Sequence, residues 1–257
     1  MKKFTLIAGP CVLDDEKTAL KIGRAVRDTC ARLGWRYIFK ASYDKANRTS
    51  VKAGRGPGID KGLAMLAAVR EKLNVPVLTD VHSPEEAHKA AFFVDALQIP
   101  AFLCRQTDLL TAAAESGLPV YVKKGQFLAP EDVDAIAEKL KAGGCEDYFI
   151  TERGTTFGYH NLVVDMRGLA TMRARGHRVI FDATHSVQRP GALGTSTGGD
   201  GHLAPVLARA AVAAGVDGLF IETHPDPAKS PSDGPNMIPL AQLPPILRQL
   251  NRIHEAL

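Results

Sequence analysis

The chain lacks the features that mark several common classes of protein. Its 257 residues include four cysteines and no Cys-x-x-Cys pair, so neither a disulfide framework nor a compact zinc finger is expected. No stretch approaches the roughly 20 apolar residues that cross a membrane. The apolar start, Phe4 to Ala8, is too short for a secretory signal. We therefore expect a soluble cytoplasmic protein with reduced thiols.

Signatures of nucleotide and nucleic-acid binding are also missing. No Gly-x-Gly-x-x-Gly fingerprint follows the first apolar run, and no Walker-type phosphate loop is present. The 32 basic and 28 acidic residues give a formal net charge of +4 and form no basic tail. This balance excludes nothing by itself, but it does not indicate a nucleic-acid partner. Membrane partners are not expected either.

The sequence does contain eight strand-sized apolar runs separated by longer stretches with helical spacing, such as Glu16 to Leu33 and Ile59 to Leu73. Such alternation in a chain of about 250 residues predicts a single-domain (β/α)8 TIM barrel over residues 1–257. An open doubly wound sheet is the alternative, and the missing dinucleotide fingerprint counts against it. The eight runs are Phe4 to Ala8, Tyr37 to Ala41, Val77 to Asp80, Ala96 to Ile99, Val120 to Lys123, Tyr148 to Thr151, Val179 to Asp182 and Gly218 to Glu222.

Nearly every run ends in charged, amide, Cys or His side chains. The carboxyl ends of barrel strands open on one face, so these residues are expected to converge there. Five cations come from the second, fifth and sixth runs, and a ligand with more than one negative charge is their natural counterpart. They are Lys40, Lys45, Lys123, Lys124 and Arg153. A second anion site is considered in the loop Asn47 to Ser50, which an ordinary surface loop explains equally well.

Candidate metal ligands follow the first, third, seventh and eighth runs and the loop after the eighth. Because a barrel closes on itself, Cys11, His185 and Glu222 are expected on three adjacent strands. A thiolate, an imidazole and carboxylates suit one divalent ion, with Zn, Fe, Mn and Co not distinguished. Spacing alone does not choose between Glu222 and His224. The full candidate set is Cys11, His82, His185, Glu222, His224 and Asp233. Schiff-base chemistry on Lys123 is a less favoured alternative.

Six blocks closely resemble the 3-deoxy-D-manno-octulosonate 8-phosphate synthase family, in order and over essentially the whole chain. They are Ile7 to Cys11, Lys40 to Ser50, Gln98 to Asp108, Lys123 to Pro130, Thr151 to Tyr159 and Phe181 to Ser186. The resemblance implies a metal-dependent transferase that condenses phosphoenolpyruvate with D-arabinose 5-phosphate, releases inorganic phosphate and serves lipopolysaccharide synthesis. It also implies a homotetramer with active sites near subunit interfaces.

The resemblance also implies roles for individual residues. Phosphoenolpyruvate would be held by Lys40, Ser42, Lys45, Lys123 and Arg153. The pentose phosphate would be held by Asn47, Arg48 and Thr49, with Arg105 reaching a neighbouring subunit, and Gln98 joins the substrate-binding set. The implied metal ligands are Cys11, His185, Glu222 and Asp233, a set that omits His224. The residues expected to be catalytic are Lys45, Asp80, Lys123, Arg153, His185 and Glu222.

Two rival functions are carried forward. The related 3-deoxy-D-arabino-heptulosonate 7-phosphate synthases use erythrose 4-phosphate and typically show Lys-Pro-Arg-Thr where this chain has Lys45 to Thr49. The extra residue, with its amide, fits a longer sugar. The other rival is a phosphosugar-binding barrel without catalysis, against which the presence of Lys123, Arg153 and His185 argues. Asp80, His82 and Glu222 are unranked candidates for proton transfer.

Overall fold

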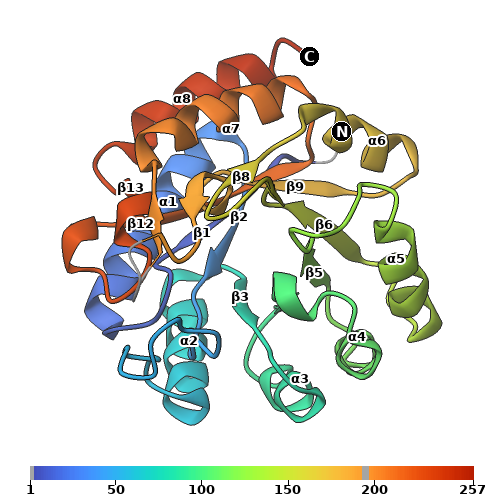
Figure 1. The fold of residues 1–257 in the computed structure, drawn as a ribbon. Coiled ribbons are helices and arrows are strands. Elements are labelled where there is room, and N and C mark those ends of the chain that lie inside the picture. Colours follow the sequence, from blue (N-terminus) through green and yellow to red (C-terminus); the bar gives the residue numbers. More distant parts are fainter. Residues whose placement is uncertain (1–2, 193–196) are drawn as a thin grey trace.

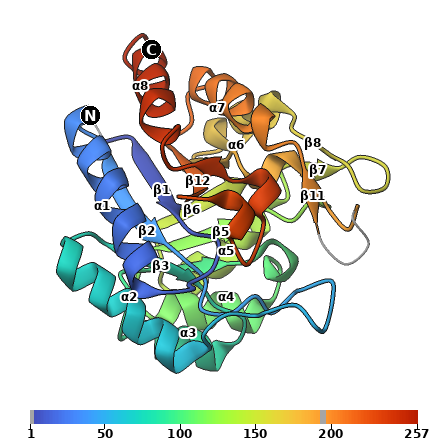
Figure 2. The ribbon, with the colours of Figure 1, turned by 90° about the vertical axis from the view of Figure 1, so that its left-hand side faces the viewer.

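The computed structural model describes residues 3–192 and 197–257 and shows a closed barrel of eight parallel strands (Figures 1 and 2). Neighbouring strands pair in sequence order, and β12 pairs with β1 to close the ring. The barrel strands are β1 (Thr5–Gly9), β2 (Arg36–Lys40), β3 (Val77–Asp80), β4 (Ala96–Ile99), β5 (Val120–Lys123), β6 (Tyr148–Glu152), β9 (Val179–Asp182) and β12 (Gly218–His224). The predicted TIM barrel is confirmed, with strand ends shifted by one or two residues.

Helices surround the barrel, and their ends follow local signals in the sequence. They are α1 (Glu16–Leu33), α2 (Ile59–Leu73), α3 (Pro84–Ala90), α4 (Thr107–Glu115), α5 (Val133–Ala142), α6 (Met166–Ala174), α7 (Ala204–Ala213) and α8 (Leu243–His254). In α1, Asp15 accepts a hydrogen bond from the backbone of Thr18, and Gly34 ends the helix at φ 70°. The helix buries Ala19, Ile22 and other apolar residues of one face against the barrel, as its helical spacing predicts.

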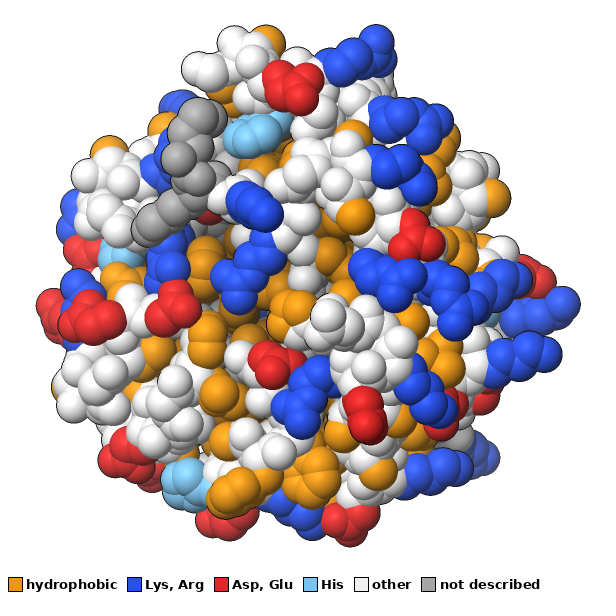
Figure 3. Space-filling model, turned by 180° about the vertical axis from the view of Figure 1, so that it is seen from behind, with side chains coloured by type: hydrophobic (Ala, Val, Ile, Leu, Met, Phe, Trp, Pro, Cys, Tyr) orange, Lys and Arg blue, Asp and Glu red, His pale blue; other side chains and the backbone are white. Residues whose placement is uncertain are grey.

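One side chain from each strand fills the barrel interior. These eight residues form a separate apolar cluster: Ile7, Ile38, Leu78, Ala96, Tyr121, Phe149, Ile180 and Phe220. The rings of Tyr121 and Phe149 stack with centroids 4.5 Å apart, and the Arg178 guanidinium lies 4.0 Å from the Phe149 centroid. The barrel is therefore a packed core rather than a pore. On the outside, Lys and Arg side chains are spread over the face opposite the view of Figure 1, where the N-terminal ends of the strands lie (Figure 3).

This interior layer explains which polar residues form the floor of the C-terminal face. Side chains alternate along a strand, so the residue two positions after each interior residue points inward again. Those residues are Gly9, Lys40, Asp80, Gln98, Lys123, Thr151, Asp182 and Glu222. At Gly9 a side chain would meet the Lys40 carbonyl oxygen, with its Cβ only 2.0 Å away. Glycine thus lets β1 and β2 approach closely at the edge of this floor.

Short elements decorate the loops above the C-terminal face. Two-residue pairings form β7 (Thr155–Thr156) with β8 (Leu162–Val163), and β10 (Gln188–Arg189) with β11 (Gly198–Gly199), while β13 (Ile238–Pro239) pairs with β12. Pairs this short leave no periodic pattern, so none of them is predicted from the sequence. Residues 193–196, between β10 and β11, lie outside the described part of the chain. Among the described residues, no helix is both long and apolar enough to cross a bilayer.

Candidate active site with a metal-ligating cluster

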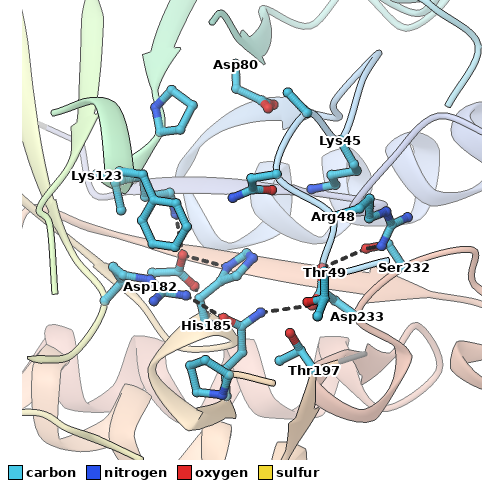
Figure 4. A pocket seen from close by; sticks show the side chains of 18 of the residues that line it. Lys45, Arg48, Thr49, Asp80, Lys123, Asp182, His185, Thr197, Ser232 and Asp233 are labelled. Atoms are coloured by element: carbon cyan, nitrogen blue, oxygen red, sulfur yellow. Dashed lines mark hydrogen bonds and ion pairs between the residues drawn. The ribbon is translucent and has the colours of Figure 1, made fainter. Parts of the chain in front are cut away.

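A cavity of about 980 Å³ opens at the C-terminal ends of the strands, where the sequence placed the chemistry. Its floor includes inward side chains of β2, β3, β4, β5 and β9, and its walls are the loops after β2, β9 and β12. In Figure 4, Lys123, Asp182 and His185 lie on one side, and Lys45, Arg48 and Asp233 lie on the other. Residues far apart in sequence therefore face one space.

On the β2 and β3 side, Lys40 is held by two neighbours. Its Nζ donates to Ser42 Oγ at 3.1 Å and lies 3.4 Å from Asp80 Oδ1, while Ser42 Oγ donates to the same oxygen at 2.6 Å. Burial opposes the charge of Asp80, but Lys40 and the neighbouring His82 outweigh it and hold the pKa of this carboxyl well below its usual range. Lys40 therefore stands as a fixed ammonium at the cavity floor.

On the β5 and β9 side, Lys123 forms a buried ion pair with Asp182. Its Nζ also lies 3.3 Å from the centroid of the Phe220 ring, over the interior layer. Burial is the largest influence and lowers the pKa of Lys123 to about 8, although Asp182 acts in the opposite direction. Asp182 Oδ2 also lies 2.7 Å from His185 Nδ1. The lysine is thus close to its titration point near neutral pH.

Arg153 enters the cavity from the end of β6 and is linked to the opposite wall. Its Nη2 donates to the side-chain oxygen of Gln188, whose Nε2 donates to Asp233 Oδ1 at 2.9 Å. Its Nη1 is buried and has no partner among the described residues. Burial lowers the pKa of Arg153, but an arginine remains charged. A free buried donor facing a cavity is suited to an oxygen of an anionic ligand.

The loop after β2 carries Lys45 to Thr49 over the cavity. Arg48 Nη1 donates to Ser232 Oγ at 2.7 Å and Nη2 donates to the Pro231 carbonyl at 3.0 Å, which ties this loop to the loop after β12. At Lys45, burial disfavours the charge, but the surrounding acidic groups, including Glu222, raise its pKa. Asn47 and Thr49 line the same wall. Lys45 and Arg48 therefore lie on the side of the cavity opposite Lys123 (Figure 4).

His82 stands between two carboxylates at the end of β3. Its Nε2 lies 3.4 Å from Asp80 Oδ2 and its Nδ1 lies 2.8 Å from Glu86 Oε2. Tyr43 also donates to Glu86, at 2.7 Å. Burial alone would lower the pKa of His82, but the two carboxylates raise it to about 9. The imidazole is consequently protonated at neutral pH.

Cys11, Glu222 and Asp233 gather where the barrel closes. One ligand atom from each lies within 4.8 Å of the others, and Cys11 Sγ donates to Asp233 Oδ2 at 3.0 Å. Both oxygens of Glu222 are buried and accept no hydrogen bond from the described residues. Burial raises the pKa of the Cys11 thiol, and the negative charge of Glu222 adds to this effect. A thiol and two carboxyl groups packed this closely suit a divalent cation.

The two histidines considered as ligands differ in position. His185 Nε2 lies 3.6 Å from Glu222 Oε1, at the edge of the cluster. His224 is on β12 two residues after Glu222, and its Nδ1 lies 2.7 Å from the Asp226 carbonyl and also accepts the Asp226 N–H. His224 is absent from the compact group of candidate ligands among the described residues. The geometry therefore favours Glu222 over His224, a choice that spacing left open.

Most of the predicted site residues converge, and one does not. Gln98 lines the cavity, whereas Ser42, Cys11 and Glu222 are buried directly around its floor. Arg105 is exposed and does not line the cavity of its own chain. Sequence reasoning gave no role to Asp182 or Gln188. Asp182 ends a strand and precedes His185 by three residues, a usable signal, but nothing in the sequence marks Gln188 as the bridge between Arg153 and Asp233.

Comparisons with known proteins show the family of the chain. The model of the DAHP synthetase I family matches residues 1–257. A 2-dehydro-3-deoxyphosphooctonate aldolase of Acidithiobacillus ferrooxidans is 56% identical over 250 residues, covering 97% of this chain and 89% of that protein. Proteins of the same name from Trichlorobacter lovleyi and Paracidovorax citrulli are 55% and 56% identical, covering 97% of this chain and 92% and 90% of their own lengths. The chain therefore belongs to the DAHP synthetase I family, among its 2-dehydro-3-deoxyphosphooctonate aldolases.

Proposed function

We propose that this protein condenses phosphoenolpyruvate with D-arabinose 5-phosphate and water to give 3-deoxy-D-manno-octulosonate 8-phosphate and inorganic phosphate. The name of its relatives describes a phosphorylated eight-carbon 2-keto-3-deoxy acid, which this reaction produces. The observation that carries the proposal is that cations from different walls face one cavity: Lys123 and Arg153 come from the ends of β5 and β6, Lys45 and Arg48 come from the loop after β2, and Lys40 lies on the floor. Two phosphorylated substrates present several negative charges that such cations can bind.

In this proposal different cations orient the two substrates. Lys40, Lys45, Lys123 and Arg153 bind the carboxylate and phosphate oxygens of phosphoenolpyruvate, and Ser42 and Gln98 complete that subsite. Asn47, Arg48 and Thr49 bind the phosphate end of the pentose, which directs its aldehyde toward the enol carbon. Holding two reactants in this orientation supplies several kcal/mol of the barrier. The new carbon–carbon bond forms between those two carbons, and water adds at the former enol carbon as phosphate leaves.

We further propose that Cys11, His185, Glu222 and Asp233 hold one divalent metal ion. The support is the compact cluster of three ligand atoms, the two buried Glu222 oxygens without hydrogen bonds, and His185 Nε2 at its edge. Such an ion, when bound, would orient or polarise an oxygen of the aldehyde or of water. The donor set suits Zn, Fe, Mn and Co alike, so the identity of the metal stays open to experiment.

We assign the proton donor from the protonation states of His82 and Asp80. Asp80 is anionic because Lys40 and His82 hold its pKa low, whereas His82 is protonated at neutral pH because Asp80 and Glu86 raise its pKa to about 9. An imidazolium facing a cavity is a proton donor, and the adjacent carboxylate keeps it in that state. We therefore rank His82 first as the donor to the oxygen that becomes a hydroxyl, with Asp80 as its partner.

Arg105 retains its predicted role across a subunit boundary. It is exposed and lies outside the cavity of its own chain, and Phe102, which does line that cavity, is 61% exposed. Exposed residues at the rim of a site are available to a second copy of the chain. We propose a homotetramer in which Arg105 reaches the pentose phosphate bound by a neighbour.

The deciding experiment compares two sugars. Phosphate release from phosphoenolpyruvate is measured with arabinose 5-phosphate and with erythrose 4-phosphate, each with and without a chelator. The proposal expects turnover with the five-carbon sugar and loss of that turnover on chelation. A preference for the four-carbon sugar would instead make this chain a heptulosonate phosphate synthase. Tight binding of both substrates without turnover would support a non-catalytic barrel.

A further inference from the structure

A second buried ion pair lies behind the cations that face the cavity. Lys124 Nζ is 3.4 Å from Glu152 Oε2, and the two side chains are 1% and 6% exposed. Neither residue lines the cavity. Removing two charges from water is costly, and a buried pair gains little stability over apolar side chains of the same volume. The pair therefore requires an explanation other than stability alone.

The position of this pair in the strands relates it to the cations of the cavity. Lys124 directly follows Lys123 at the end of β5, and Glu152 directly precedes Arg153 at the end of the neighbouring strand, β6. Successive side chains of a strand point to opposite faces. With Lys123 and Arg153 directed into the cavity, their neighbours meet on the outer face of the same two strand ends. Each cavity-facing cation is thus adjacent in the chain to one member of the pair.

Glu152 fixes the backbone from which Arg153 projects. Its Oε1 accepts hydrogen bonds from the backbone N–H groups of Arg153, at 2.9 Å, and Gly154, at 2.6 Å. Gly154 has φ 91°, in the left-handed region that favours glycine. A charged acceptor bound to two successive N–H groups holds this turn in one conformation. The direction of the Arg153 side chain is set by that turn.

Lys124 fixes the backbone turn after β5 in the same way. Its Nζ donates to the Leu128 carbonyl at 2.8 Å, closing the turn over residues 124–128. Its backbone N–H donates to the Thr151 carbonyl of β6 at 2.8 Å. The same turn carries Gln126, which lines the cavity and whose backbone carbonyl accepts a hydrogen bond from the Thr156 N–H at 3.0 Å. One ion pair therefore joins the two turns that carry Lys123 and Arg153.

We propose that Lys124 and Glu152 form a positioning pair that sets the spacing between Lys123 and Arg153 and so preforms the phosphoenolpyruvate subsite. This inference rests on the proposed function. Neither residue touches the substrate in this account, because both act through the backbone turns of the residues that do. Residues that support a binding group in this way often matter nearly as much as the group itself.

The test separates substrate binding from turnover in four variants. Glu152→Ala removes the acceptor of both N–H groups, and we expect the KM for phosphoenolpyruvate to rise about tenfold or more, because small displacements of a binding group are costly. The KM for arabinose 5-phosphate should stay within about twofold of the wild type, because its subsite lies on the other wall. Glu152→Gln keeps the accepting oxygen and should restore part of the loss. Lys124→Met with Glu152→Gln should bind better than Lys124→Met alone, because no buried carboxylate is left unpaired.

A matched control accounts for general loss of stability. Asp134 Oδ1 of α5 lies 2.8 Å from Nε2 of the buried His177, and the same carboxylate pairs with Arg175. None of these three residues lines the cavity. Asp134→Asn should lower the melting temperature without altering either KM. If Glu152→Ala lowers the melting temperature equally and leaves the phosphoenolpyruvate KM within about twofold of the wild type, the pair is only structural and the proposal is wrong.

A second measurement keeps this inference distinct from the proposed function. Calorimetric titration with phosphoenolpyruvate alone needs no turnover. Weaker binding by Glu152→Ala, partly restored in Glu152→Gln, supports the positioning pair even if the wild type fails to condense the two substrates. Unchanged phosphoenolpyruvate affinity in both variants would overturn the pair, whatever the sugar assay shows.

Discussion

The two halves of the barrel mouth differ in how their charges are compensated. In the half formed by β2, β5 and β6, Lys40 contacts Ser42 and Asp80, and Lys123 is paired with Asp182 of the neighbouring strand β9. In the half where β12 meets β1, the two oxygens of Glu222 accept no hydrogen bond from the described residues, and the Cys11 thiol contacts another acidic group. The lysines of the first half each have a carboxylate partner. In the second half the acidic groups Cys11, Glu222 and Asp233 outnumber the nearby cations, which are Lys45 and Lys40, whose Nζ is 3.9 Å from Glu222 Oε1.

This difference indicates two kinds of binding. Cations that are already held by carboxylates are preorganised, so an anionic substrate meets them without rearrangement of the site. Acidic groups that outnumber the cations beside them repel one another, and a divalent ion would reduce that repulsion. The cation half is therefore expected to control substrate affinity, and the other half is expected to control metal occupancy. The experiments below test whether the two halves separate in this way.

The largest effect is expected for Lys123→Met. The substitution keeps a long side chain over Phe220 but removes the buried ammonium and leaves Asp182 beside His185. We expect kcat/KM for phosphoenolpyruvate to fall about 10³-fold, in the range seen when a preorganised donor is removed. Metal content, measured by atomic emission, should not change. Joint loss of metal and activity would contradict the division into two halves.

Cys11→Asn and Cys11→Ala probe the other half as a matched pair. Asparagine offers an oxygen and an amide near Asp233 in place of the thiol, and we expect this variant to lose most of its sensitivity to chelators. Alanine offers no ligand atom, so this variant should bind metal at least about 10- to 100-fold more weakly, the loss seen when only a residue supporting a ligand is removed. The measurement is phosphate release after chelation. Equal chelator sensitivity in both variants and the wild type would remove Cys11 from the metal site.

Arg48→Ala should act mainly on the sugar. Arg48 currently donates to Ser232 and to the Pro231 carbonyl, so its loss frees the loop after β12 as well as removing a cation. We expect kcat/KM for arabinose 5-phosphate to fall about 10- to 100-fold, the range for hydrogen bonds to a charged group. The KM for phosphoenolpyruvate serves as the internal control. A comparable rise in that KM would show that the two subsites are not independent.

The smallest expected effect is a pH dependence set by Lys123. Burial lowers its pKa to about 8, so the free enzyme loses this positive charge as the pH rises through 8. Binding of an anion requires the protonated form, and kcat/KM for phosphoenolpyruvate should therefore decrease about tenfold per pH unit above that value. A Lys123→Arg variant stays charged to much higher pH. Its pH profile should lack the decrease, and an identical decrease in both proteins would assign it to another group.

The barrel could be predicted from the sequence because its signal is local and repeated. Runs such as Val77 to Asp80 and Val120 to Lys123 match observed strands residue for residue, and inward alternation then places Lys40, Asp80, Lys123 and Glu222 on one floor. The end of β12 lies two residues beyond the predicted run, because this strand continues through Thr223 and His224 to pair with Ile238 and Pro239. That pairing depends on a loop conformation that no local pattern encodes.

The site was predictable where it sits on strands and less so where it depends on loops. Glu222 and His224 are two residues apart on one strand, so the sequence does not show which of them is the metal ligand. In the structure, His224 Nδ1 has two contacts with Asp226, which distinguish it from Glu222. Gln188 was missed because its role comes from joining Arg153 to Asp233 across 35 and 45 residues of sequence. Conversely, the Lys123-Lys124 and Glu152-Arg153 dipeptides are visible in the sequence. Their pairing becomes apparent once β5 and β6 are seen side by side.

The most direct measurement of the central claim is a metal titration of chelated enzyme, followed by phosphate release with phosphoenolpyruvate and arabinose 5-phosphate. The account predicts that activity returns in proportion to added divalent ion and saturates at one ion per chain. It also predicts that chelated enzyme still binds phosphoenolpyruvate, because Lys40, Lys123 and Arg153 are held by other residues. Full activity of the chelated enzyme without added metal would contradict the account.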